Sequence, residues 1–244
     1  MSCIINFIDE GTAPFTVENS AQNKNFLILE NASHQSLDKY IEVNNTGLSE
    51  DSCKILLFDI VNAVSAMHSR GICHKDIKPD NILLTGDKYY LKLCDFGYSE
   101  SFLDSNKKKI KLKKYFGTSG FYAPEVGELI PFDGEKADIY SIGNTIFSLL
   151  IGVKIFDRTQ YNFGFDLYKL IKKGKIGTFW SIIERITNMN ISKSFKILFI
   201  NMVQYDPLKR YTTNQILNSE WMHGAQNLNR NILINELRKR ESKF

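Results

Sequence analysis

The chain begins with short apolar runs separated by polar stretches, a pattern typical of strands. Residues 4–8 and 25–29 could each form one short strand, and residues 9–24 between them are mostly polar. Further on, residues 82–94 place two apolar or alternating runs around the turn-forming sequence Thr-Gly-Asp-Lys. We therefore predict two short strands joined by a long polar connection, and a later β-hairpin.

A long amphipathic helix is predicted after Ser49. Glu50 and Asp51 follow this N-cap candidate, and Gly71 is a natural residue for the helix end. The apolar positions recur at helical spacing and predict a stripe that faces the core, made of Ile55, Leu56, Ile60, Ala63, Val64 and Met67.

The longest apolar run, residues 139–156, contains the polar residues Ser141, Asn144, Thr145 and Ser148. This frequency of polar residues is typical of a helix buried in a protein, not of a membrane span. The N-terminus lacks the basic start and apolar stretch of a signal peptide. We therefore expect no membrane association.

Composition places the chain among globular proteins. Its 244 residues are 43% hydrophobic and 24% charged, enough for one sizeable core. The net charge of +4, with its main cluster at residues 107–114, is too small to indicate a nucleic-acid partner. The four cysteines show no C-x-x-C spacing, so we interpret them as reduced thiols of an intracellular protein, cytoplasmic or also nuclear.

Oxygen-bearing side chains gather at the two ends of the predicted hairpin. Asp76 and Asn81 precede it, and Asp95 follows it. Because the two ends of a hairpin lie together, these groups face one place. Carboxylate and amide oxygens are ligands that hard divalent cations prefer, so the set can hold a metal and orient a hydroxyl.

The sequence around these residues resembles the catalytic loop and magnesium loop of eukaryotic protein kinases. The first motif reads His-Lys-Asp-Ile-Lys-Pro-Asp-Asn at 74–81, with Lys75 in place of an arginine, and the second is Asp-Phe-Gly at 95–97. Ala-Pro-Glu follows at 123–125. A lysine two residues beyond Asp76, here Lys78, resembles the pattern of serine/threonine kinases more than that of tyrosine kinases. The overall pattern looks closest to the calcium/calmodulin-dependent and energy-sensing kinase group.

The resemblance implies an α+β, protein-kinase-like fold with a mainly helical large lobe and a truncated β small lobe. Residues 1–32 would be the remnant of the small lobe, with two strands and a hinge. Residues 33–224 would form the large lobe, and residues 225–244 a basic C-terminal tail.

The resemblance also implies phosphoryl transfer from ATP to a hydroxyl of a protein substrate, with Mg²⁺. Asp76 would accept or orient the substrate proton, and Lys78 would neutralise the moving phosphate. Thr118 would bridge these two residues. Asn81 and Asp95 would hold the metal.

Three residues of the matched pattern imply an adenine site. The backbone carbonyl of Glu30 and the amide of Ala32 would bind the adenine edge, and Leu83 would form the floor. Leu29 would guard the back of this pocket.

Other matched residues imply structural roles. Asp138 would anchor the catalytic loop through backbone amides, and Arg210 would pair with Glu125. Lys75 cannot reproduce the planar fork with which the family's arginine grips a phosphate, and Lys114 occupies the position of the usual phosphorylated threonine. We hypothesise that activity does not depend on phosphorylation there.

The tail at 225–244 has apolar residues at helical spacing beside Arg238, Lys239 and Arg240. A calmodulin-like partner could bind such a helix, although packing on the lobe or fraying is the simpler expectation.

Some family features do not occur in this sequence. No G-x-G-x-x-G precedes a strand, and no V-A-I-K-like lysine follows one. One interpretation is a truncated form of an active kinase, favoured because Asp76, Asn81 and Asp95 are all present. The alternative is a catalytically inactive, kinase-like binding or scaffold protein. A different nucleotide hydrolase has little support without a G-x-x-x-x-G-K-[ST] loop.

Overall fold

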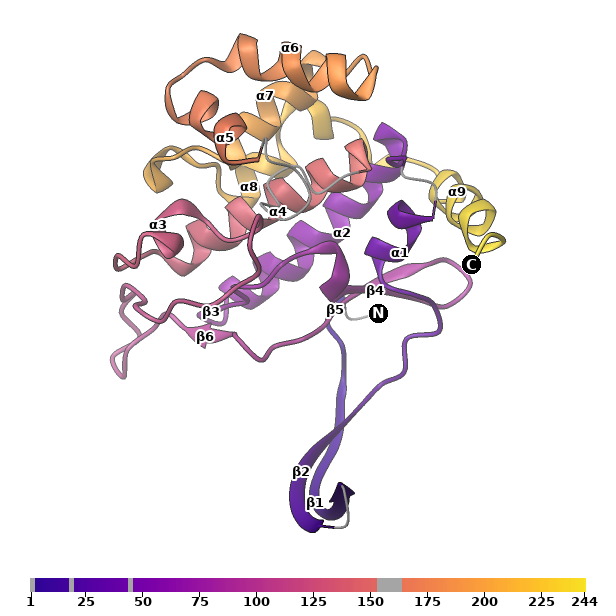
Figure 1. Ribbon diagram of the computed structural model, residues 1–244, viewed down its shortest axis with the longest axis vertical. Coiled ribbons are helices and arrows are strands. Elements are labelled where there is room, and N and C mark those ends of the chain that lie inside the picture. The colour runs from indigo at the N-terminus through magenta and orange to yellow at the C-terminus, as the bar shows by residue number, and fades with distance from the viewer. Residues whose placement is uncertain (1–2, 18–19, 44–45, 153–163) are drawn as a thin grey trace.

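A computed structural model describes residues 3–17, 20–43, 46–152 and 164–244 (Figure 1). A mainly helical body carries one long β-hairpin that projects from it. The strands are β1 Phe7–Val17, β2 Ser20–Leu29, β3 Ile72–Cys73, β4 Ile82–Thr85, β5 Tyr90–Leu93 and β6 Glu100–Ser101. The helices are α1 Leu37–Glu42, α2 Glu50–His68, α3 Pro124–Gly127, α4 Gly134–Ile151, α5 Gly164–Lys172, α6 Ile176–Thr187, α7 Lys193–Met202, α8 Thr213–Leu217 and α9 Asn231–Glu241.

Helices α2 and α4 form the centre of the body. The Ser49 hydroxyl accepts from the Ser52 amide at the start of α2, as the N-cap prediction requires, and Asp133 caps α4 in the same way. Nearly every residue of α4 is buried, because other helices and the loop at residues 74–81 surround it. Residues 153–156 of the predicted apolar run lie outside the described residues.

The predicted hairpin at 82–94 is confirmed as β4 and β5, which pair antiparallel from Ile82 opposite Leu93 to Thr85 opposite Tyr90. The start of the chain joins the same sheet, since the Ile5 amide donates to Leu93 O at 2.9 Å and the Leu93 amide donates to Cys3 O at 2.8 Å. Strand β3 pairs with β6, so that Ile72 is opposite Ser101 and Cys73 is opposite Glu100.

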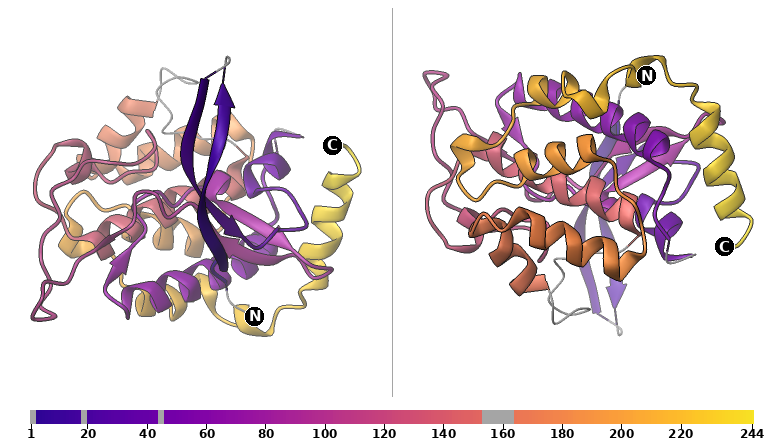
Figure 2. Two further views of the ribbon diagram at one scale, coloured as in Figure 1. Left: turned by 90° about the horizontal axis from the view of Figure 1, so that it is seen from below. Right: turned by 90° about the horizontal axis from the view of Figure 1, so that it is seen from above.

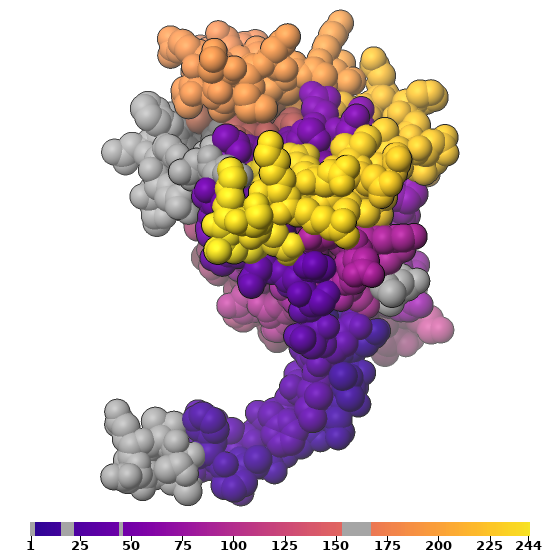
Figure 3. Space-filling model, turned by 90° about the vertical axis from the view of Figure 1, so that its right-hand side faces the viewer, coloured from indigo at the N-terminus to yellow at the C-terminus, as the bar shows by residue number. Residues whose placement is uncertain are grey.

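The prediction of two short strands joined by a polar connection was wrong. The strands β1 and β2 continue through most of residues 9–24 as one antiparallel hairpin. Polar side chains fit these strands because the hairpin projects from the body as an arm (Figure 3). For the same reason Leu29, expected to close the back of a pocket, is 44% exposed.

The tail packs on the body, which was the simpler of the two expectations for it. Helix α9 lies along one flank (Figure 2) and buries Leu233, Ile234 and Leu237. The apolar face that a calmodulin-like partner would need is therefore covered in this structure. Among the helices of the described ranges, none has the length and hydrophobicity to cross a membrane.

Candidate active site

The loop at residues 74–81 is shaped by a buried carboxylate from α4. Asp138 accepts the backbone amides of His74 and Lys75, both at 2.9 Å, and its Oδ2 also lies 2.8 Å from His68 Nε2. These contacts compensate the burial of Asp138 and hold Lys75 at a φ of +68°, a conformation that non-glycine residues rarely adopt. The predicted anchoring role of Asp138 is confirmed by these contacts.

The next residue, Asp76, directs its carboxylate into a cluster of four donors. Oδ1 accepts the Thr118 amide at 2.9 Å and the Thr118 hydroxyl at 2.7 Å. Oδ2 accepts Asn81 Nδ2 at 2.9 Å and lies 2.9 Å from Lys78 Nζ. Burial opposes ionisation of Asp76, but the hydrogen bonds from Lys78 and Thr118 outweigh it and hold its pKa below the ordinary value.

Lys78 and Thr118 lie together, as the resemblance implies. Lys78 Nζ donates to Thr118 Oγ1 at 2.6 Å, so the threonine hydroxyl lies between the ammonium and the Asp76 carboxylate. One positive and one negative side chain are thereby held side by side at the same point. Such an arrangement can receive a proton from a hydroxyl and neutralise a nearby anion.

Asn81 and Asp95 are brought together by the end of the β4–β5 hairpin. The Cys94 amide donates to Asn81 O at 3.0 Å, which places the residue before Asp95 against Asn81. Asn81 uses its amide nitrogen toward Asp76, so its Oδ1 is the atom that could ligate a metal. Asp95 has a φ of +61°, and its Oδ1 accepts the Gly97 amide at 3.3 Å.

This donor set fits Mg²⁺, which commonly takes one or two protein oxygens and completes its shell with water and substrate phosphates. Within the described residues, no group of three or more His, Cys, Asp and Glu residues forms a metal site.

His74 has a structural position beside this site. Its Nε2 lies 3.0 Å from Cys94 O and its Nδ1 lies 3.3 Å from the Asp76 amide, which assigns the proton to Nε2. Burial lowers its pKa, so the ring is neutral. It packs on the Phe96 ring at 5.0 Å between centroids.

The residues predicted for adenine lie where the hairpin arm meets the body. No hydrogen bond among the described residues uses the Glu30 carbonyl or the Ala32 amide, so both are available. Leu83 is half-buried on the face of β4 opposite the buried Ile82 and Leu84.

The sequence did not reveal the partners of the Glu30 side chain. Its carboxylate lies 2.5 Å from the buried Lys92 Nζ and accepts both nitrogens of Asn6. Burial opposes ionisation of Glu30, but these contacts lower its pKa. Lys92 is opposite Leu83 in the β4–β5 register and lies on the same face as Leu83, away from Leu91 and Leu93, yet it is buried. A buried lysine is almost always paired with an opposite charge, and Glu30 supplies it here.

The predicted pairing of Arg210 with Glu125 is confirmed. Arg210 Nη1 and Nη2 each donate to one oxygen of the Glu125 carboxylate at 2.7 Å, and both side chains are buried. This bidentate pair fixes the segment that follows Thr118 to the connection between α7 and α8.

Comparison with known proteins now decides the family. The profile described as Protein kinase domain matches residues 4–222. The chain belongs to the protein kinase family. The predicted α+β, protein-kinase-like fold and the serine/threonine type are confirmed with it.

Individual relatives agree with this membership. The serine/threonine-protein kinase chk1 of Schizosaccharomyces pombe is 30% identical over 207 residues, which cover 84% of this chain and 39% of that protein. CBL-interacting protein kinase 9 of Oryza sativa subsp. japonica is 33% identical over 203 residues, 83% of this chain and 41% of the relative. Maternal embryonic leucine zipper kinase of Xenopus laevis is 32% identical over 202 residues, 82% of this chain and 29% of the relative. The chain thus spans less than half the length of each of these relatives.

Proposed function

We propose that this chain carries the catalytic half of a serine/threonine protein kinase, which transfers a phosphoryl group from ATP to a hydroxyl of a protein substrate. One observation carries the proposal. Thr118, Asn81 and Lys78 hold the Asp76 carboxylate in a single hydrogen-bonded cluster, which includes one of the two residues, Asn81 and Asp95, that would hold the metal. Protein kinases as a family use ATP and Mg²⁺.

Each residue has a task that its surroundings support. Asp76 orients the substrate hydroxyl and accepts its proton, and a lowered pKa suits this role because phosphoryl transfer relies on positioning more than on a strong base. Thr118 holds the carboxylate in one orientation. Lys78 places a positive charge where negative charge accumulates on the transferred group.

Asn81 Oδ1 and the Asp95 carboxylate would hold Mg²⁺, and the Glu30 carbonyl and Ala32 amide would bind the adenine edge above Leu83. Bound Mg-ATP supplies the transferable phosphoryl group and neutralises part of its charge. The division into residues 1–32, 33–224 and 225–244, and a cytoplasmic or nuclear location, belong to the same proposal.

The alternative function, that of a catalytically inactive kinase-like binding or scaffold protein, has its own supporting observation. Lys24 is the one lysine in β1 and β2, and it lies over the Phe15 ring at 5.6 Å, toward the far end of the arm. It is therefore not placed to hold phosphates beside Asp95. A kinase-like binding or scaffold protein would not need such a lysine.

Calorimetric titration of the whole chain with ATP, in Mg²⁺ and then in EDTA, separates the two functions. We expect Mg²⁺-dependent binding in the micromolar range that Asp95→Ala abolishes, because the variant removes the metal-binding carboxylate. Asp87→Ala, in the exposed turn of the β4–β5 hairpin, is the matched control and should bind as the unmodified chain does.

Absence of binding at millimolar ATP would contradict the nucleotide site and favour the scaffold. Binding that Asp95→Ala leaves unchanged would contradict the assignment of the metal ligand. Where binding is found, phosphate transfer to a generic basic protein with Asp76→Asn as the negative control tests the reaction itself.

A further inference from the structure

The side chain of Lys75 is not explained by the cluster around Asp76. Its backbone forms the catalytic loop, but its side chain is only 4% exposed and its Nζ lies 2.6 Å from Glu100 Oε2. Glu100 comes from β6, which pairs with β3 so that Cys73 is opposite Glu100. A largely buried ion pair is tolerated when its geometry is good, so this contact is a built feature of the fold.

The same ammonium contacts a second element. It lies over the Phe116 ring at 5.3 Å from the centroid, and Phe116 stacks on Tyr98 at 5.0 Å with 12° between the planes. Tyr98 and Glu100 stand at the beginning of the segment 98–125, and Phe116 stands near its end. Lys75 thus holds the two ends of this segment together, and we call Lys75, Tyr98, Glu100 and Phe116 the clasp.

The clasp is adjacent to the residues that orient Asp76. Gly117 follows Phe116 with a φ of +134°, and a Cβ there would approach Lys75 O to 3.1 Å. The next residue is Thr118, whose amide and hydroxyl both donate to Asp76. A shift of Phe116 would therefore pull Thr118 away from the carboxylate.

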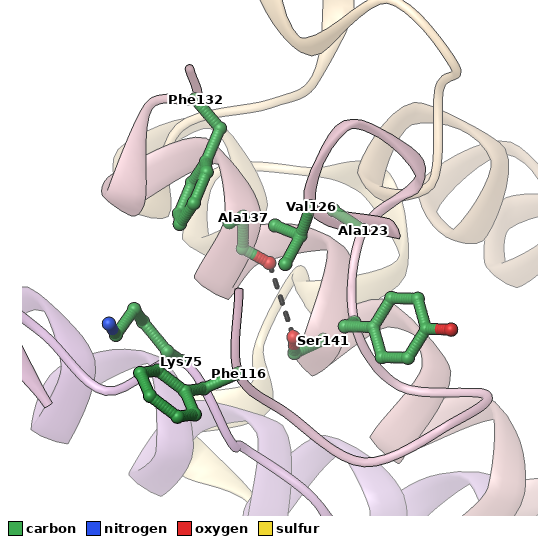
Figure 4. A pocket seen from close by; sticks show the side chains of 8 residues that line it. Lys75, Phe116, Ala123, Val126, Phe132, Ala137 and Ser141 are labelled. Atoms are coloured by element: carbon green, nitrogen blue, oxygen red, sulfur yellow. Dashed lines mark hydrogen bonds between the residues drawn. The ribbon is translucent and has the colours of Figure 1, made fainter. Parts of the chain in front are cut away.

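The clasp is closely packed toward α3 and α4, although Tyr98 and Phe116 each remain 41% exposed. The cavity lined by Lys75, Phe116 and residues of α3 and α4 (Figure 4) holds about 10 Å³, roughly one water. A phosphate group would not fit there. The negative charge that accompanies Lys75 is the Glu100 carboxylate, supplied by the chain itself.

We infer that Lys75 and Glu100 are positioning residues, which act through Phe116 to hold Thr118 against Asp76 without an added phosphate. The kinetic consequence rests on the proposed function, whereas the structural consequence does not. The clasp orders the segment 98–125 in a chain that carries no modification.

Amide hydrogen exchange of Thr118, followed by NMR on protein shown by mass spectrometry to be unphosphorylated, tests this directly. We expect slow exchange in the unmodified chain and exchange at least about tenfold faster in Glu100→Gln and Lys75→Met. The exchange of α4 amides should be unchanged, which separates a local loss from a loss of the fold. The pair Lys75→Glu with Glu100→Lys should recover part of the protection.

Glu135→Gln is the matched control, because it removes a carboxylate that pairs with Lys109 on the exposed side of the same segment. It should leave Thr118 exchange unaltered. If the reaction is measurable, Glu100→Gln should lower kcat about tenfold with an unchanged KM for ATP, since the clasp orients Asp76 and does not touch the nucleotide.

Equal Thr118 exchange in Glu100→Gln and the unmodified chain would overturn the inference. So would fast exchange in the unphosphorylated chain that becomes slow only after phosphorylation of segment 98–125. A chain that binds no ATP but shows the expected exchange pattern would contradict the proposed function and leave the clasp supported.

Discussion

Asp76 shows how a single side chain balances two opposing effects. Burial raises the cost of its negative charge, and the donors from Thr118, Lys78 and Asn81 repay that cost with hydrogen bonds. The result is a carboxylate that stays ionised well below neutral pH. The contribution of Asp76 to the free energy of unfolding must therefore decrease as the pH falls.

The folded chain keeps Asp76 ionised at pH values where the unfolded chain, with an ordinary pKa of about 3.9, already binds a proton. The contribution of Asp76 is thus complete above that pH and is lost as pH falls through the folded pKa. We expect the free energy of unfolding to fall less steeply between pH 6 and pH 3 in Asp76→Asn than in the unmodified chain. Urea unfolding at a series of pH values measures this.

Asp87→Asn, in the exposed turn, should keep the slope of the unmodified chain. Glu30, Glu184 and Glu241 also have lowered pKa values, but they are present in every variant and cancel in the comparison. Parallel profiles for Asp76→Asn and the unmodified chain would show that Asp76 is not held ionised by the fold.

Residue-level prediction from sequence reached the groups that lie in motifs resembling those of protein kinases. Asp76, Thr118, Asp138 and Arg210 belong to this class. Glu100 was missed because it is an ordinary surface-type residue in sequence and gains its role only from the pairing of β6 with β3. A contact across 25 positions between a lysine and one of many carboxylates has no local pattern.

At the scale of elements, α9 is held by polar contacts as much as by its apolar face. Arg240 is buried and donates to the backbone carbonyls of Tyr40, Thr46 and Gly47, at 2.9, 2.7 and 2.5 Å. Glu236 accepts from the Ser49 amide at the start of α2, where negative charge also complements the helix dipole. Through these hydrogen bonds α9 holds the end of α1 and the start of α2 in place.

Arg240→Lys tests this role of α9. A lysine ammonium cannot reproduce the planar fork that reaches three carbonyls, so carbonyls would lose their donors. We expect a loss of about 1.5–3 kcal/mol in the free energy of unfolding, read from urea denaturation. Lys239→Ala, on the exposed side of the same helix, should change it by less than about 0.5 kcal/mol. Equal effects of the two variants would mean that α9 is only loosely attached.

Elements in which apolar residues or turn residues recur in a regular pattern were predictable from the sequence, and elements without such a pattern were not. The apolar stripe predicted the position of α2, and the turn residues predicted the position of the β4–β5 hairpin, both close to the observed bounds. The arm was misjudged because neither of its faces packs on a core, so residues 9–24 carry no apolar alternation. Its strands exist through backbone pairing with each other, which composition does not record.

The molecule as a whole joins two parts of unequal packing. The body encloses a continuous core built around α2 and α4. The arm instead exposes large apolar residues, among them Phe7, Phe15 and Leu27, which are 58%, 56% and 64% exposed. A two-stranded hairpin without a core is at best marginally stable in water. The free energy that opens the arm should therefore be far below that which opens the body.

Hydrogen–deuterium exchange of the whole chain, followed by mass spectrometry, tests this difference. We expect amides of β1 and β2 to exchange at least about a hundredfold faster than those of α4, because the arm opens without unfolding the body. Leu27→Ser should leave the urea midpoint of the body unchanged, whereas Leu149→Ser, in the fully buried part of α4, should lower it sharply. Protection of the arm equal to that of α4, in dilute protein, would show that the arm is stabilised by the body after all. Protection that grows with protein concentration would show instead that a second copy covers its apolar side chains.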